Sequence, residues 1–266
     1  MIRVAGLDVG LALERRTSGA ATIIDRHIHL SREKGGARAC APIISAGPFQ
    51  VIAVDGPIVP KGSDLRRPRA VERLFASGRF QRRCKPGFSH VPGTGLQLRA
   101  CAGAAADCLT DAATLDETSA PFPRVRPGSI VEAFPNAFLG VCLEERCYGE
   151  MPGLRRGRKF DWLYDQWVRH DLVTRLPLPG GLQGLPRLFA STSDHEERAA
   201  LICALTALLT ARGTFTAVGD EAAGWFLLPP WEVWQPWACD AVETGCERLN
   251  ALGAKLRIER GTPPRP

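Results

Sequence analysis

The amino-acid sequence predicts an α/β fold in which helices cover a mixed β-sheet. Three β-like runs fill the first 33 residues, a short apolar run ends at Asp55, and a further β-like run lies in GSIVEAF. Helix-compatible segments lie between and after these runs, an order that favours helices packed on a sheet. With 266 residues, 45% of them hydrophobic, the chain can bury a large core, and we expect a single domain over 1–266.

The strands are placed by short apolar runs and by the turn residues that bound them. Residues 2–9 predict the first strand, and SGAATIID and HIHLSRE predict two more, which together would form a β-meander. The run from Phe49 to Val54 is too short for a helix and predicts a fourth strand that ends at Asp55, before Pro57. GSIVEAF predicts the fifth strand.

The helices are placed by composition, periodicity and capping signals. A short helix is expected near 68–76, inside a basic inserted segment of about 60–95, and others at Leu96 to Leu115 and Lys159 to Leu176. The strongest helix signal is STSDHEERAALICALTALLTARG, where Ser193 and Glu196 have the spacing of a capping box and Gly213 marks the end. Two β-like runs then surround a turn in TFTAVGDEAAGWFLLPP, and a closing helix is expected at about 237–252.

Positive charge is concentrated in one segment. The net charge is +6, yet Lys61 to Arg99 holds ten basic residues against two acidic ones. Such an excess favours binding of phosphate groups, so nucleic acid is an expected partner. A solvated surface with many counter-charges is the structural alternative. The predicted nucleic-acid-binding residues are Arg66, Arg67, Arg69, Arg82, Arg83 and Lys85.

The nine cysteines are scattered and include no C-x-x-C pair. This pattern argues against a cysteine-rich zinc site and against a disulfide framework. The N-terminal residues lack a signal-peptide pattern, and no segment approaches the length of a membrane span. We therefore expect no membrane partner and a reducing, cytoplasmic compartment.

Two aspartates end two of the predicted strands. Asp8 closes GLDVG, and Asp55 stands in VIAVDGP. If these strands are parallel neighbours, both carboxylates emerge at one edge of the sheet, where ligands bind in open α/β sheets. Carboxylates brought this close repel one another unless a cation joins them, and Mg²⁺ or Mn²⁺ prefers such ligands. The alternative is that each aspartate is a turn former that accepts backbone hydrogen bonds.

Further acidic residues are candidates for the same site. On a helical period Glu197 and Asp194 lie on the stripe of Leu201, Leu205 and Leu208, so we select both as metal ligands. Glu132 lies in an apolar strand and needs either a metal or a buried salt bridge to an arginine. The capping box accounts for an acidic residue at Glu196, and a favourable interaction with the helix dipole could account for Asp194. His195 is either catalytic or an exposed first-turn residue.

Several of these stretches resemble one family. GLDVG, VIAVDGP, RRCKPG, IVEAFPNAFLG, DHEERAALICALTALL and VGDEAAGWFLLPP resemble the domain-of-unknown-function family 429, whose members are predicted nucleases with a ribonuclease H-like fold. The resemblance spans roughly 1–230. It implies a five-stranded mixed sheet, a divalent metal, and an acidic centre at Asp8, Asp55 and the 194–197 cluster, with Glu132 nearby. The chain departs from the family at Ala199, where many relatives carry an acid.

The leading hypothesis is a metal-dependent nuclease. Asp8, Asp55 and Glu197 would bind Mg²⁺ or Mn²⁺, and Glu132 would be a further metal ligand or would orient one. His195 would assist catalysis, and the basic segment would hold the phosphate backbone. Two other hypotheses stay open. GLDVG also resembles the first phosphate loop of actin-like ATPases and sugar kinases, although no second glycine-rich motif is found. A non-catalytic nucleic-acid-binding module would account for Ala199.

Overall fold

The strands form one continuous sheet. The computed structural model describes residues 2–12, 14–59, 67–84, 87–110, 112–113, 129–153, 158–180 and 182–262. Within these residues eight strands pair in the order β3-β2-β1-β4-β5-β7-β6-β8. The strands are β1 (Arg3–Asp8), β2 (Ser18–Ile24), β3 (His27–Glu33), β4 (Val51–Asp55), β5 (Ser129–Ala133), β6 (Thr216–Asp220), β7 (Gly224–Leu228) and β8 (Arg257–Arg260).

The predicted mixed α/β class is confirmed, but the sheet is larger than the five strands expected. The strands toward both ends of the sheet pair in antiparallel fashion, whereas β1, β4 and β5 run parallel in the middle. Strand β7 joins β5 through a single parallel pair, Ala133 with Leu227, and carries β6 and β8 with it. The two β-like runs after the long helix therefore extend the first sheet.

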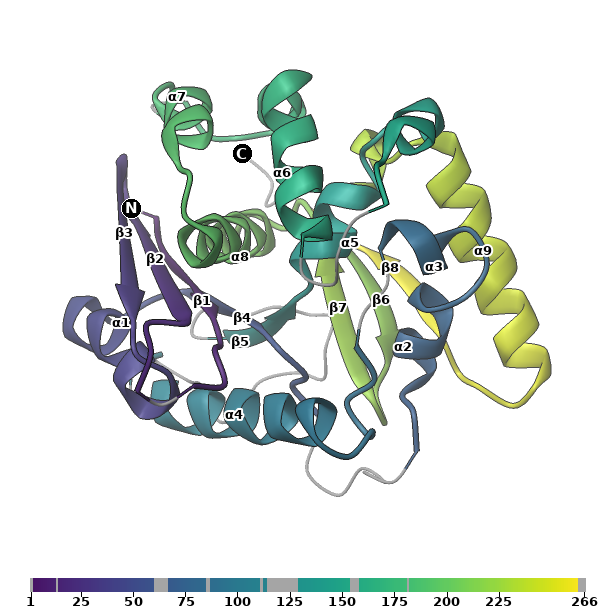
Figure 1. The fold of residues 1–266 in the computed structure, drawn as a ribbon, viewed down its shortest axis with the longest axis horizontal. Helices are drawn as coiled ribbons and strands as arrows, with labels where there is room; N and C mark the ends of the chain where they lie inside the picture. The colour runs from purple at the N-terminus through teal and green to yellow at the C-terminus, as the bar shows by residue number, and fades with distance from the viewer. Residues whose placement is uncertain are drawn as a thin grey trace.

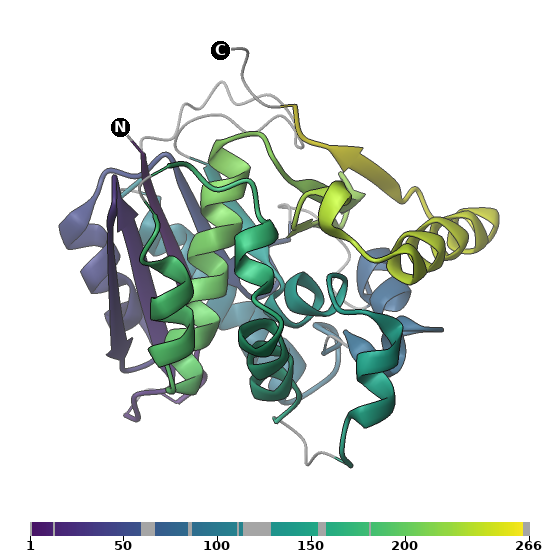
Figure 2. The ribbon, with the colours of Figure 1, turned by 90° about the horizontal axis from the view of Figure 1, so that it is seen from above.

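Helices cover both faces of the sheet, which is why the central strands are apolar throughout. On one face lies α8 (His195–Ala211), and on the other lie α4 (Thr94–Leu109) and α1 (Ala41–Ala46) (Figure 1). Helices α6 (Lys159–Arg169) and α7 (Leu185–Ser191) form an outer layer over α8 (Figure 2). Helix α6 ends at Arg169, before the predicted end at Leu176, and the 3₁₀ helix η3 (Leu172–Arg175) follows it.

Most of the remaining helices pack at the end of the sheet that β7, β6 and β8 form. Helices α2 (Ala70–Phe75), α3 (Phe80–Arg83) and α9 (Pro236–Ala251) gather at that end (Figure 1). Phe75, Phe134 and Phe226 form an aromatic cluster there, with ring centroids 4.9–6.1 Å apart. The other elements are η1 (Gly36–Cys40), α5 (Pro135–Gly140), η2 (Glu145–Glu150) and η4 (Trp231–Val233).

Two glycines let α8 lie directly on the backbone of the sheet. A Cβ atom at Gly6 would lie 2.1 Å from the amide nitrogen of Ala204, and one at Gly19 would lie 2.0 Å from the carbonyl oxygen of Glu196. Any side chain at either position would push the helix off the sheet. These contacts fix the N-terminal turn of α8 beside the end of β1, because Gly19 is the register partner of Asp8.

The predicted cap of α8 is wrong by one residue. Asp194, not Ser193, is the N-cap, because its side chain accepts hydrogen bonds from the backbone N–H groups of Glu196 and Glu197, both at 3.2 Å. None of the helices that the structure describes combines the length and the apolar character needed to cross a membrane.

Candidate functional site

Asp8 and Asp55 lie side by side. Strands β1 and β4 are parallel neighbours, and Asp8 and Asp55 are register partners at the last position of each. Neighbouring strands lie about 4.8 Å apart. Side chains alternate along a strand, so both carboxylates share the face of Gly6 and Ala53, which α8 covers. The predicted meeting of two carboxylates at one edge of the sheet is thus confirmed.

Burial and neighbouring acidic charge destabilise the ionised form of both carboxyl groups. Burial, followed by the charges of Asp55, Glu196 and Asp194, raises the pKa of Asp8 well above its ordinary value. Burial, followed by the charge of Glu132, raises the pKa of Asp55 to about 7. Neither carboxylate pairs with a lysine or arginine anywhere in the described part of the chain. Among the residues that the structure describes, the pair therefore has no compensating cation.

The first turn of α8 brings acidic charge to this edge of the sheet. The backbone of Glu196 touches β2 at Gly19, beside Asp8, and the charge of Glu196 acts on Asp8. Arg32 on β3 pairs with Asp194 at 2.9 Å and lies 3.8 Å from Glu196. The Asp194 carboxylate thus accepts hydrogen bonds from the helix backbone and pairs with Arg32. It lies near the site, but these interactions already occupy the oxygens that a metal ion would need.

The structure favours Glu196 over Glu197 as the helix residue of the site. The acidic charges that act on Asp8 belong to Asp55, Glu196 and Asp194, and Glu197 is not among them. His195 is the exposed first-turn residue that the sequence left as an alternative, and its Nδ1 atom lies 3.0 Å from Asp161 on α6, in the outer layer. The stripe of Leu201, Leu205 and Leu208 does not identify the face of α8 that meets the aspartates.

Cys203 is a further residue that sequence reasoning missed. Burial raises the pKa of its thiol well above the ordinary value, and the charges of Asp55 and Asp8 raise it further. Glu196, Ala200 and Cys203 are spaced by four and three residues, so they share the face of α8 that packs on β1 and β2. Counting helical positions from Glu196 instead of from Glu197 would have identified this face in the sequence.

Glu132 forms the buried salt bridge that the sequence left as an alternative. Its two carboxylate oxygens each lie 2.7 Å from a guanidinium nitrogen of Arg69, and one also accepts the backbone N–H of Ile58 at 2.9 Å. Glu72 pairs with the same arginine at 2.9 Å. The side chains of all three charged residues are at most 4% exposed. The charge of Glu132 therefore raises the pKa of Asp55, while the Glu132 oxygens themselves are bound by Arg69 and Ile58.

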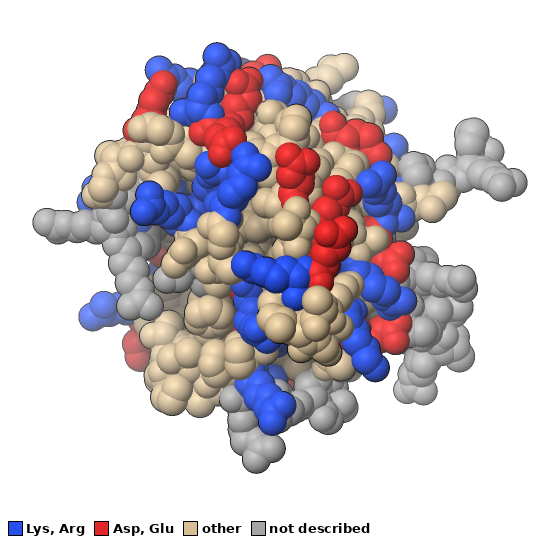
Figure 3. Space-filling model, turned by 90° about the vertical axis from the view of Figure 1, so that its right-hand side faces the viewer, with Lys and Arg blue, Asp and Glu red and all other residues tan. Residues whose placement is uncertain are grey.

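The same ion pair removes Arg69 from the predicted nucleic-acid-binding set, because a buried guanidinium held by two carboxylates cannot reach a phosphate. Arg83 is half-buried, pairs with Glu145 at 2.6 Å and stacks over Trp237. Arg67 and Arg82 are exposed, whereas Arg66 and Lys85 lie outside the described residues. On the face in Figure 3, basic and acidic side chains are interspersed. That face therefore shows no single continuous positive patch.

The glycines that follow the two aspartates have packing roles. A Cβ atom at Gly10 would lie 1.9 Å from the carbonyl oxygen of Thr17, and one at Gly56 would lie 2.7 Å from the Cβ atom of Ala102 on α4. The Gly10 N–H donates to Ser18 Oγ at 2.9 Å. That hydrogen bond occupies the amide that a phosphate loop would present, so the geometry does not favour an actin-like nucleotide site.

The carboxylate pair suits a hard divalent cation in part. No group of three or more His, Cys, Asp or Glu side chains is placed to hold a metal ion by itself within the described ranges. Mg²⁺, however, is often bound by one or two carboxylates together with waters and substrate phosphates. Asp8 and Asp55 supply two such carboxylates, and neither pairs with a cation within the described ranges, so they offer the donor set that this ion needs.

Removing the charge of Asp55 is expected to stabilise the fold, and more so at high pH. The pKa of Asp55 is about 7 in the folded protein against an ordinary 3.8, so stability is lost as pH rises through that interval. Asparagine does not ionise. The variant Asp55→Asn should therefore gain little in Tm at pH 4 and about 3–5 °C at pH 8, in metal-free buffer, by thermal unfolding. An equal change at both pH values would contradict the charge repulsion.

Comparison of the chain with protein-family models, with curated proteins and with solved structures finds no match. The resemblance to family 429 therefore stays a prediction that rests on the quoted stretches and on the geometry above.

Proposed function

We propose that the protein is a metal-dependent phosphodiesterase that acts on nucleic acid and is built on a ribonuclease H-like core. The observation that carries the proposal is the register pairing of Asp8 with Asp55 at the ends of two parallel strands, where no lysine or arginine among the described residues pairs with either of them. The five neighbouring strands β3-β2-β1-β4-β5, with acids from the first strand, the fourth strand and a late helix, support the ribonuclease H-like assignment.

Asp8 and Asp55 would hold Mg²⁺ or Mn²⁺ through their carboxylate oxygens. When bound, such an ion activates water and stabilises the leaving oxygen in phosphodiester cleavage. Without it, a pKa of about 7 leaves Asp55 roughly half protonated at neutral pH. Cation binding therefore competes with this proton, and affinity should rise between pH 6 and pH 8.

Glu196 and Arg32 would complete the site from the side of α8 and β3. Arg32 lies 2.9 Å from Asp194 and 3.8 Å from Glu196, so it orients the acids of the helix turn. Arg82 is exposed, and its guanidinium would contact phosphates of a bound nucleic acid. The net charge of +6 favours an anionic substrate in general.

A cleavage assay tests this proposal. The purified protein is incubated with end-labelled single- and double-stranded DNA and RNA in Mg²⁺, in Mn²⁺ or in chelator, and with ATP in a parallel reaction. We expect products from at least one nucleic acid with either ion and none in chelator. ATP turnover without cleavage would instead support the phosphotransferase hypothesis, and tight nucleic-acid binding that ignores chelator would support the non-catalytic one.

Two neighbouring glutamates of α8 provide a matched comparison. Glu196→Gln should lower the cleavage rate by about 10–100-fold, the usual effect of removing a supporting group at a metal site. Glu197→Gln removes one negative charge from the same helix turn, so it changes the interaction with the helix dipole in the same way. It should change the cleavage rate by less than about twofold. Steady-state rates at saturating Mg²⁺ measure both, and a larger loss in Glu197→Gln would reverse the assignment.

A further inference from the structure

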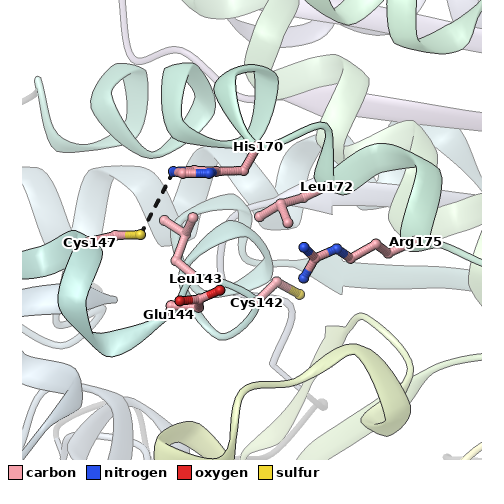
Figure 4. A pocket seen from close by; sticks show the side chains of 7 residues that line it. All are labelled: Cys142, Leu143, Glu144, Cys147, His170, Leu172 and Arg175. Atoms are coloured by element: carbon pink, nitrogen blue, oxygen red, sulfur yellow. Dashed lines mark hydrogen bonds between the residues drawn. The ribbon is translucent and has the colours of Figure 1, made fainter.

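A pocket lies between the chain that follows α5 and the end of α6, within the α/β fold but built from residues that the proposed site does not use. The empty space in it, counted together with the open solvent at its mouth, is about 240 Å³. A small molecule would therefore meet this hollow from solvent rather than be enclosed by it. The lining residues are Cys142, Leu143, Glu144, Cys147, His170, Leu172 and Arg175 (Figure 4).

A thiol and an imidazole face each other in this pocket. The Sγ atom of Cys147, on η2, lies 3.8 Å from the Nε2 atom of His170, the C-cap residue that follows α6 (Figure 4). Cys147 is 8% exposed, whereas the His170 ring is open to solvent. A nucleophile and a base within hydrogen-bonding reach are the minimum arrangement for covalent chemistry at sulfur.

The walls of the pocket are held by hydrogen bonds from large aromatic side chains to backbone oxygens. Trp237 Nε1 donates to Leu143, Trp167 Nε1 donates to Leu139, both at 2.8 Å, and Tyr148 Oη donates to Gly140 at 2.7 Å. Both indoles are buried. These bonds anchor the chain between α5 and η2, and the bond from Trp167 also joins that chain to α6, the helix that precedes His170.

One charge in the pocket is available to a ligand. Arg175 is exposed at the end of η3, and no ion pair to it occurs in the part of the chain that the structure describes. The acidic residue of the pocket, Glu144, is already paired with Arg146 at 2.6 Å. Arg175 points toward the pocket in Figure 4, so it can receive a carboxylate from a bound molecule.

Cys147 needs the neighbouring base in order to react. Burial, followed by the charge of Glu144, raises the pKa of its thiol above the ordinary value, with Arg146 opposing the shift. The thiol is therefore protonated at neutral pH, and a thiolate is the reactive form. His170 is placed to accept that proton.

We propose that Cys147 is a site of thiol–disulfide exchange with small disulfides that carry carboxylates. Cys147 Sγ attacks one sulfur of the disulfide R–S–S–R while His170 Nε2 accepts the thiol proton. A new bond joins Cys147 to that sulfur, the original S–S bond breaks, and the departing RS⁻ takes the proton from His170 to become RSH. The Cys147 sulfur is oxidised, the leaving sulfur is reduced, and Arg175 holds the carboxylate.

The experiment compares two small disulfides of opposite charge on the native, full-length protein. Dithiodipropionate carries two carboxylates and cystamine carries two ammonium groups. After timed exposure and acid quenching, trypsin cleaves after Arg146 and separates Cys147 from Cys142, so mass spectrometry reports each thiol by itself. We expect Cys147 to react about fivefold faster with dithiodipropionate than with cystamine, the scale of one exposed ion pair, and the preference to vanish in urea.

Three variants separate the proposed roles. Arg175→Gln should bring the rate ratio of the two disulfides close to one, and His170→Gln should slow both reactions without changing the ratio. Arg169→Gln is the matched control, because Arg169 is exposed on α6 and pairs with Glu150 outside the pocket lining, and it should leave the ratio unchanged. Equal rates with both disulfides in the native protein would overturn the proposal, as would an unmodified Cys147 while the half-buried Cys101, Cys108 and Cys239 react.

Discussion

Replacing Asp8 with asparagine is expected to lower metal-dependent cleavage by more than about 100-fold, since losing a direct ligand exceeds the usual effect of losing a supporting residue. The fold should survive, because the Asp8 carboxylate is repelled by Asp55, Glu196 and Asp194 and makes no ion pair within the described residues. At pH 8 and without metal, the Tm of Asp8→Asn should equal or exceed that of the wild type. Cleavage rates and thermal unfolding of the same preparations measure both effects.

The matched control is Asp107→Asn, which removes an exposed carboxylate from α4 on the opposite face of the sheet. It should leave both the cleavage rate and the Tm near the wild-type values. Full activity in Asp8→Asn would remove Asp8 from the proposed centre. A large fall in its Tm would show that Asp8 has a structural role instead.

Replacing Arg69 with methionine is expected to destabilise the protein by about 3–5 kcal/mol, because two buried carboxylates lose the guanidinium that pairs with both. Glu132 and Glu72 are 4% and 1% exposed, and both bind this one guanidinium. The expected fall in Tm is on the order of 10 °C. The loss should be smaller at pH 5 than at pH 8, since burial already raises the pKa of Glu132 and protonation would relieve the unpaired charge.

Arg73→Met on the same helix provides the comparison. Arg73 is exposed, and a surface substitution of this kind usually changes stability by at most about 0.5 kcal/mol. Denaturant unfolding of both variants gives the two free energies. A change in Arg69→Met as small as that in Arg73→Met would mean that the ion pair contributes nothing to the fold.

The sequence predicted the centre of the fold because local pattern suffices there. The short apolar runs that end at Asp8 and Asp55 are typical of buried strands. Parallel pairing of these strands then places the two carboxylates together. The outer part of the sheet was not predicted. Strand β8, with the sequence RIER, carries charged side chains and no apolar alternation, so only its pairing with β6 identifies it.

The helix residue of the site was missed for a different reason. Every residue of α8 from Ala199 to Thr210 is buried, so hydrophobicity marks no single face of this helix as the one on the sheet. The close approach of Gly6 and Gly19 to α8 decides which face it is, and that contact joins residues nearly two hundred positions apart. Likewise Glu132 required a partner, but nothing local could identify Arg69, 63 residues away, as that partner.

A crystal soaked in Mn²⁺ tests most directly whether the Asp8 and Asp55 carboxylates are held together by a divalent cation. We expect an anomalous density peak between the two carboxylates at about 2–2.3 Å from an oxygen of each, typical of a small divalent ion, and its absence in Asp55→Asn crystals soaked in the same way. Wild-type crystals that show no such peak, with the two carboxyl groups hydrogen-bonded to each other through a shared proton, would contradict the account.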